Sequence, residues 1–171
     1  HCPEAISLTH AEEYEPRLQS VGYVIPKFET RRQTILDQVN SIAISKKLTV
    51  SPDDDLVNEI TGLVEWPVTL CGTFDESFLE VPHECLISTM EQNQKYLATK
   101  AANGVLTNTF LFVANLESTD PEMVITGNER VIRPRFADAK FFFETDKQKQ
   151  LKDLRQGLAR VIYQKELGST F

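Results

Sequence analysis

The sequence lacks the short motifs that mark the commonest catalytic and metal sites. It has no glycine-rich phosphate-binding loop, no G-x-S-x-G nucleophile motif and no pair of closely spaced cysteines. Apolar runs are also short, and none approaches the roughly 20 residues that a membrane-spanning helix needs. We therefore expect no catalytic site, no metal site and no membrane span in this chain.

Positive charge is in short supply. Eighteen Lys and Arg residues stand against 25 Asp and Glu residues, which gives a net charge of −7. Proteins that bind nucleic acid through a broad electrostatic surface are usually basic. Any nucleic-acid contact must therefore be local, or lie in a part of the protein outside this chain.

Length and composition are those of a soluble globular protein. The 171 residues, of which 41% are apolar and 25% charged, suffice for one domain with a buried core. The three cysteines (Cys2, Cys71 and Cys85) follow no disulfide pattern and are expected as reduced thiols in the cytoplasm. The chain begins at His1 without the features of a signal peptide, and we expect it to be a piece of a longer protein.

Helical and β-prone patterns occur in blocks along the chain. We expect helices over 8–20, 27–47, 52–65 (after Ser51 as N-cap), 82–94, 121–145 with an interruption at Pro134, and 149–163. Residues 67–74 are β-prone, and two further β-prone runs flank Asn103-Gly104, a dipeptide that favours a tight turn. The segment 109–116 has few polar alternations, so both of its faces should be covered.

This order of elements favours an α+β fold, with an antiparallel β-hairpin or sheet packed against several helices, over alternating βαβ units. A single domain is expected over residues 1–171. Residues 1–65 should be mainly helical, residues 66–118 strand-rich with the hairpin around 103–104, and residues 119–171 helical.

Two groups of potential metal ligands have simpler explanations. His83, Cys85 and Cys71 could be imagined as zinc ligands, but their spacing matches no common zinc pattern. A surface histidine and two buried thiols are the favoured interpretation. The acidic run 53–55 could bind a cation, yet acidic residues there suit the N-terminus of the following helix.

The segment 125–146, "ITGNERVIRPRFADAKFFFETD", combines three arginines with three consecutive phenylalanines. At about 100° per residue, one helical stripe contains Ile132, Phe136, Ala139 and Phe143, which predicts a buried face. Phe141 points away from that stripe. We expect it to be an interface residue, covered by a neighbouring element or by another domain or subunit.

The same segment carries a local basic cluster. Its members are Arg130, Arg133, Arg135 and Lys140. Ion pairs with Glu129, Asp138 and Glu144 could hold the helix against its neighbours. Contact with a phosphate backbone is the alternative. The residues alone favour the ion pairs, because the chain as a whole is acidic.

A second polar group lies in "MEQNQKYL" (90–97). Gln94 and Lys95 could touch nucleic acid there, and Tyr96 could stack on a nucleotide. The same residues could equally form a polar turn with a half-buried tyrosine. The sequence leaves both interpretations open.

Five segments resemble the beta subunits of bacterial tetrameric glycyl-tRNA synthetases. They are "LVEWPV" (63–68), "MEQNQKY" (90–96), "FVANLES" (112–118), "GNERVIRPRFADAKFFFETD" (127–146) and "VIYQKELGS" (161–169). The segments occur in the family order with similar separations, and the resemblance is weaker over residues 1–50. Leu97 departs from the family pattern, which often has phenylalanine after the tyrosine.

The resemblance implies a cytoplasmic heterotetramer of two alpha and two beta subunits. The alpha subunit would carry the catalytic site for glycine and ATP, together with Mg²⁺. The beta subunit would be required for aminoacylation and would supply tRNA recognition. This chain would be an internal fragment that precedes the HD-like domain of the beta subunit, without a cofactor or a catalytic site of its own.

Two roles for the chain stay open on this basis. It could be a noncatalytic module that helps to orient the subunits and contacts tRNA(Gly) through Arg130, Arg133, Arg135, Lys140, Gln94 and Lys95. Alternatively, it could be a purely structural module that docks through Phe141 against the alpha subunit or a neighbouring beta-subunit domain, without touching tRNA.

Overall fold

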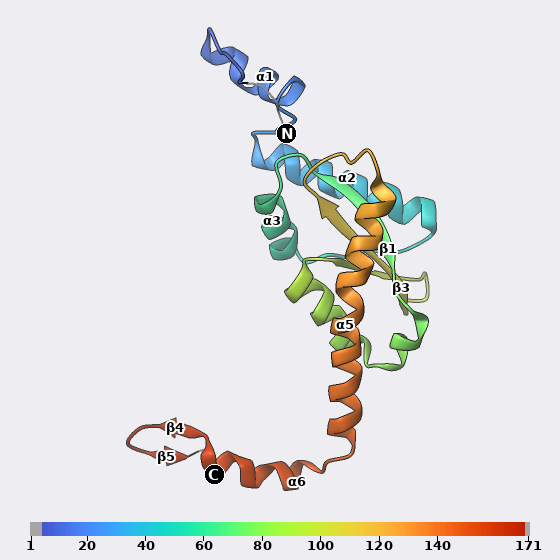
Figure 1. Ribbon diagram of the computed structural model, residues 1–171, viewed down its shortest axis with the longest axis vertical. Coiled ribbons are helices and arrows are strands. Elements are labelled where there is room, and N and C mark those ends of the chain that lie inside the picture. The colour runs from blue at the N-terminus through green and yellow to red at the C-terminus, as the bar shows by residue number, and fades with distance from the viewer. Residues whose placement is uncertain (1–4, 170–171) are drawn as a thin grey trace.

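A computed structural model describes residues 5–169 and places a three-stranded antiparallel sheet between two layers of helices (Figure 1). The strands are β1 (Val68–Thr73), β2 (Leu97–Lys100) and β3 (Leu106–Ala114). Strand β3 is central, and both of its neighbours run antiparallel to it. The expected α+β fold is confirmed, and so is the hairpin around Asn103-Gly104 that joins β2 to β3.

The helices divide between the two faces of the sheet. One face carries α2 (Phe28–Lys46) and α3 (Asp54–Leu63). The other carries α4 (His83–Ser88), the π-helical segment η3 (Thr89–Gln94) and α5 (Pro121–Lys147). The remaining short helices before the hairpin are η1 (Ala11–Glu13), α1 (Tyr14–Ser20) and η2 (Glu76–Glu80).

Strand β3 is buried on both faces, as its continuous apolar pattern predicts. Phe110, Leu111 and Phe112 are consecutive and all buried. Because side chains alternate along a strand, Phe110 and Phe112 enter one core while Leu111 enters the other, with Ile35 and Ile60. One short segment therefore supplies both cores.

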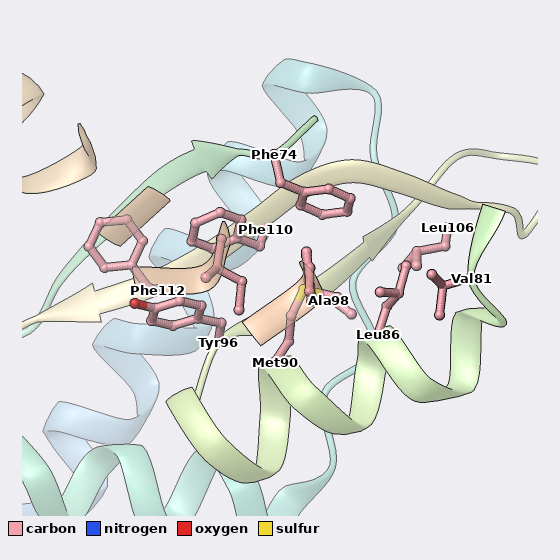
Figure 2. Close-up of a cluster of buried hydrophobic side chains, with 11 residues drawn as sticks. Phe74, Val81, Leu86, Met90, Tyr96, Ala98, Leu106, Phe110 and Phe112 are labelled. Atoms are coloured by element: carbon pink, nitrogen blue, oxygen red, sulfur yellow. The ribbon is translucent and has the colours of Figure 1, made fainter. Parts of the chain in front are cut away.

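The larger core holds α5 against the sheet. Figure 2 shows the side chains that the strands, α4 and η3 contribute to it. Its buried members are Phe74, Val81, Leu86, Met90, Tyr96, Ala98, Leu106, Phe110, Phe112, Ile132 and Phe136. The rings of Phe74 and Phe136 meet edge to face with centroids 4.8 Å apart. Ile132 and Phe136 are fully buried, and Phe143 packs at the edge of the same cluster. The core stripe expected on this helix is confirmed.

Helix α5 continues through Pro134, so the expected interruption is wrong. Proline removes one helical hydrogen bond, which leaves the carbonyl of Arg130 without its usual donor. Pro134 and Arg130 are both exposed, so water can reach that carbonyl. The buried side chains on either side of the proline, Ile132 and Phe136, hold the two halves of the helix to one core.

The start of α3 also differs from the prediction. Asp53, not Ser51, is the N-cap, and its carboxylate accepts a hydrogen bond from the Asp55 N–H at 3.3 Å. Asp54 and Asp55 follow in the first turn, where negative charge is favoured. The acidic run 53–55 thus serves the helix N-terminus, as the simpler interpretation holds.

The helix expected over 149–163 is wrong. The chain instead forms α6 (Leu151–Leu154), a 3₁₀ segment η4 (Arg155–Arg160) and the short strands β4 (Ile162–Gln164) and β5 (Gly168–Ser169). Figure 1 shows this C-terminal arm beyond the far end of α5, away from the sheet. Leu151 is 87% exposed. The segment has the apolar spacing of a helix, but Leu151 stays exposed. A short helix without a buried face is only marginally stable in water.

Gly72 of β1 allows the closest approach in the core. A Cβ atom at this position would lie 2.6 Å from Cζ of the fully buried Phe110 on β3. At Gly127, in the interior of α5, a Cβ would meet no heavy atom within 4 Å. A side chain at position 72 is therefore limited by steric contact with Phe110. At position 127 only the helix propensity of the residue matters.

Gly72→Ala should lower the free energy of unfolding by about 1–3 kcal/mol, because an added methyl group overpacks the core. Gly127→Ala should raise it by about 0.5–1 kcal/mol, because alanine is the better helix former. Urea unfolding followed by circular dichroism measures both changes. A Gly72→Ala protein as stable as the parent would contradict the close packing of β1 on Phe110.

Candidate nucleic-acid interface

The candidate basic residues lie on α5, a helix that the sequence specifies at its start and along its buried face. Asp120 caps the helix by accepting a hydrogen bond from the Met123 N–H at 3.1 Å, and Pro121 occupies the first turn. Ile132 and Phe136 fix the rotation of the helix about its axis. The positions of the arginines around α5 follow from that rotation.

The three arginines do not share one face. At about 100° per residue, Arg133 and Arg135 stand about 160° apart, whereas Arg130 and Arg133 stand about 60° apart. Arg133 lines an open hollow of about 270 Å³ with Asp75 and Glu129, beside the end of β1. Arg135 is close enough to Tyr96, on the opposite flank, to influence its pKa. Arg130 and Arg133 therefore form a pair, and Arg135 is separate.

Expected ion pairs of the arginines are not formed. In the described range 5–169, no ion pair joins Arg130, Arg133 or Arg135 to a carboxylate. Glu129 instead accepts hydrogen bonds from the backbone N–H and the hydroxyl of Thr73, at 2.7 and 3.0 Å. That carboxylate fastens α5 to β1, and all three guanidinium groups lie on exposed residues.

The charge of Arg133 is only a minor influence on the nearby Asp75 carboxyl. Hydrogen bonds from Ser77 hold the pKa of the Asp75 carboxyl below its usual value, and the positive charge of Arg133 makes a smaller contribution in the same direction. The Ser77 N–H donates to Asp75 at 2.9 Å. The main partner of Asp75 is thus its own turn, not the arginine.

Lys140 and Lys95 are engaged within the fold. Lys140 Nζ lies 2.9 Å from Glu80 Oε2, and this hydrogen bond raises the pKa of the lysine. Lys95 Nζ lies 2.8 Å from Glu59 Oε2. Gln94, beside it, donates to the backbone carbonyl of Asn93 at 2.9 Å. Ion pairs thus already occupy both lysines.

Tyr96 belongs to the core, so it cannot stack on a nucleotide, and the contact of Gln94 and Lys95 with nucleic acid stays a prediction. The side chain is only 5% exposed and stacks on Phe110, with ring centroids 4.8 Å apart. Its hydroxyl donates to Oδ1 of Asn128 at 2.6 Å. Burial raises the pKa of this hydroxyl, and the charge of Arg135 offsets part of the rise. A nucleotide base has no access to the ring.

Two phenylalanines of α5 are exposed side by side. Phe141 is 63% exposed and Phe142 61%, and their rings meet edge to face at 5.6 Å. Phe141 points away from the buried stripe, as its helical position predicts, and its role as an interface residue stays a prediction. The sequence did not single out Phe142, because its position on the flank of the helix stripe leaves room for cover by a neighbour. No element within 5–169 buries either ring, so the pair forms an apolar end on α5.

The distribution of charge along the sequence indicates the basic residues of α5, whereas the net charge of the chain does not. Ten of the 18 Lys and Arg residues fall within residues 130–165, which contain four acidic residues. Residues 48–94 contain ten acidic residues and no Lys or Arg. The acidic average therefore conceals a basic segment over residues 130–165, which begins with the arginines of α5.

The described residues show no other site with evident chemistry. No group of three or more His, Cys, Asp or Glu side chains in the range 5–169 is placed to hold a metal ion. Cys71 and Cys85 are free thiols, burial raises the pKa of Cys71, and Cys2 lies outside the described range. Cys85 is exposed, so the expectation of two buried thiols is wrong for this residue. None of the helices described there has the length and apolarity to cross a membrane.

Comparison with known proteins gives one consistent answer. The family described as "Glycyl-tRNA synthetase beta subunit" matches residues 1–171. The glycine–tRNA ligase beta subunit of Pseudoalteromonas translucida is 50% identical over 169 residues, that of Chromohalobacter salexigens 48% over 169 and that of Methylobacillus flagellatus 49% over 164.

These alignments cover 99%, 99% and 96% of this chain but only 24%, 24% and 23% of the relatives. The chain thus spans about a quarter of the length of the curated relatives it matches. Both the match over the whole chain and the level of identity far exceed a likeness in fold alone. The chain belongs to the glycyl-tRNA synthetase beta subunit family.

Proposed function

We propose that this segment of a glycine–tRNA ligase beta subunit is a noncatalytic module that supports glycyl-tRNA synthesis by contacting tRNA. The observation that carries the proposal is the state of the α5 arginines. Arg130, Arg133 and Arg135 are exposed and free of ion pairs in the described residues, whereas Lys95 and Lys140 nearby are paired. An exposed guanidinium group without an ion pair can offer its hydrogen-bond donors to phosphate oxygens.

Arg130 and Arg133 are the primary contact in this proposal. They are three residues apart on a helix, which places their side chains as neighbours on one surface. Arg135 lies on the other flank and would meet a different part of the RNA. Gln94 and Lys95 lie on that flank as well, around the hollow that Tyr96 and Asn128 also line. Arg135 and Gln94 thus offer a second polar contact, and Lys95 would join it only by leaving its ion pair with Glu59.

The distribution of charge supports a defined orientation of the RNA. The acidic segment 48–94 would repel a phosphate backbone, and the basic segment 130–165 would attract it. We infer that tRNA approaches along α5 and the C-terminal arm. The catalytic chemistry with glycine, ATP and Mg²⁺ would belong to an alpha subunit in the same cytoplasmic heterotetramer.

A second role rests on a separate observation, the exposed Phe141–Phe142 pair. Two large apolar side chains in contact at the surface of a helix are typical of a docking site. The partner would be the alpha subunit or a neighbouring domain of the beta subunit. Docking and tRNA contact use different residues of α5, so they can be tested separately.

Reversing the charge of Arg130 and Arg133 together, by Arg130→Glu and Arg133→Glu, should weaken the binding of tRNA(Gly). The loss of two phosphate contacts should lower affinity by about tenfold or more at 0.1 M salt and reduce the slope of log affinity against log salt by about 1.5–2. Fluorescence anisotropy with labelled tRNA(Gly) over a range of salt concentrations measures both quantities.

The matched control is the pair Lys46→Glu and Lys47→Glu, which changes the net charge equally at the end of α2, on the other face of the sheet. Its affinity and salt slope should stay close to those of the parent. Equal losses of affinity in the two double variants would show that the change in net charge alone causes the effect. Unchanged affinity in the arginine variant would exclude the tRNA contact.

Replacing Phe141 and Phe142 by serine should impair association with the alpha subunit and leave the melting temperature of this chain unchanged. Phe143→Ser is the contrasting variant, because Phe143 packs against the larger core. It should lower the free energy of unfolding by about 1–3 kcal/mol. Co-purification of the subunits and thermal unfolding separate the two effects. Normal assembly of the Phe141→Ser/Phe142→Ser variant would contradict the docking role.

A further inference from the structure

Two aromatic rings stand at the edge of an open cavity that neither of these roles uses. Tyr23 and Trp66 meet edge to face, with centroids 5.5 Å apart and planes at 83°. Together with the segment 116–119 they line a cavity of about 530 Å³. The lining residues of that segment are Leu116, Glu117, Ser118 and Thr119. We name this site the aromatic corner.

The aromatic corner is assembled from three loops that hydrogen bonds tie together. Tyr23 follows α1, Trp66 precedes β1, and residues 116–119 connect β3 to α5. The side chain of Asn115 accepts from the backbone N–H groups of Glu65 and Trp66, at 2.7 and 3.0 Å. The Ile25 N–H donates to the Glu65 carbonyl at 2.9 Å. These bonds hold together the loops that carry the two rings.

Tyr23 occupies a backbone conformation that tyrosine rarely adopts. Its φ is +52°, in the left-handed region that glycine and asparagine populate with less strain. Gly22, next to it, is packed so closely that a Cβ there would lie 2.7 Å from the Leu18 carbonyl oxygen. A large ring kept in a strained turn and 48% exposed contributes little to the core. About half of its surface therefore remains available for a contact outside the fold.

The chemistry of the corner fits a cation. Aromatic faces attract Lys and Arg side chains, and a planar guanidinium can stack on an indole ring. Glu117 adds a carboxylate to the same cavity. We propose that the aromatic corner binds an arginine side chain presented by a partner protein. This inference is independent of the tRNA contact on α5.

Nucleotide binding is disfavoured by the charges around the corner. Glu117 lines the cavity, and Asp120 and Glu122 follow in the next turn of chain. The nearest basic side chains in sequence are engaged elsewhere. Arg17 donates to the Ser7 carbonyl at 3.3 Å, Lys27 pairs with Glu15 at 2.8 Å, and Arg31 donates to the Ile25 carbonyl at 2.7 Å. A phosphate group would meet carboxylates here without a cation to balance it.

Trp66 is the single tryptophan of the chain and reports directly on the site. Titration of the 171-residue protein with N-acetyl-arginine amide should give a saturable change in tryptophan emission, in the millimolar range. N-acetyl-citrulline amide, which has nearly the same shape without the charge, should give none. Adenosine monophosphate serves as the nucleotide probe and should also leave the emission unchanged at matched ionic strength.

Two variants test the residues. Tyr23→Gly and Glu117→Gln should each weaken the binding of N-acetyl-arginine amide about threefold to fivefold. Glu122→Gln, a carboxylate removed outside the cavity, should not. The melting temperature of Tyr23→Gly should stay within about 3 °C of the parent, because glycine relieves the left-handed strain and offsets the loss of the ring contact.

Three results would overturn the inference. The first is an emission that does not respond to N-acetyl-arginine amide. The second is an equal response to the citrulline compound, which would remove the role of charge. The third is preferential binding of adenosine monophosphate, which would make the corner a nucleotide site. A Tyr23→Gly protein that melts well below the parent while keeping full affinity would likewise assign the ring a structural role only.

Discussion

The burial of β3 on both faces is the constraint on which the rest of the structure depends. Three consecutive apolar side chains, Phe110, Leu111 and Phe112, must be covered from opposite directions. The layer of α2 and α3 covers one side, and the layer of α4, η3 and α5 covers the other. Gly72 lets β1 approach Phe110 closely enough to complete the larger core. The helices are placed where they are because this strand leaves no face to water.

The surface of α5 follows from that packing. Once Ile132 and Phe136 enter the core, every other position on the helix has a fixed direction. Glu129 is directed to β1, where it bonds to Thr73. Its engagement there leaves Arg133 without the ion pair that sequence spacing suggests. The hydrogen bonds between Glu129 and Thr73 thus leave the charge of Arg133 available for contacts outside the fold. The rotation of α5 likewise places Arg130 and Arg133 on one flank and Arg135 on the other.

Predictions from the sequence succeeded where an apolar pattern had a surface to meet. The stripe of α5, the helix over 28–46 and the doubly covered strand all depend on periodic side chains that end up buried. The helix over 149–163 failed for the converse reason: Leu151 and Leu154 have the right spacing but stay exposed. Local chemistry also misled at Pro134, where a solvent-exposed backbone tolerates the missing hydrogen bond. The directions of the arginines, and the meeting of Tyr23 with Trp66, arise from tertiary contacts that no single segment encodes.

Because α5 continues through Pro134, a movement at one end of the helix is transmitted to the other end. A helix of 27 residues is about 40 Å long at about 1.5 Å per residue. Ile132 and Phe136 fix the helix to the larger core, and the distance along the helix from Ile132 to its last residue, Lys147, is about 22 Å by the same rise per residue. A tilt of about 10° at the core contact would displace the far end by about 4 Å, given that rise. A protein that grips the Phe141–Phe142 end would therefore turn the arginines as well, because a rigid helix cannot move at one end alone.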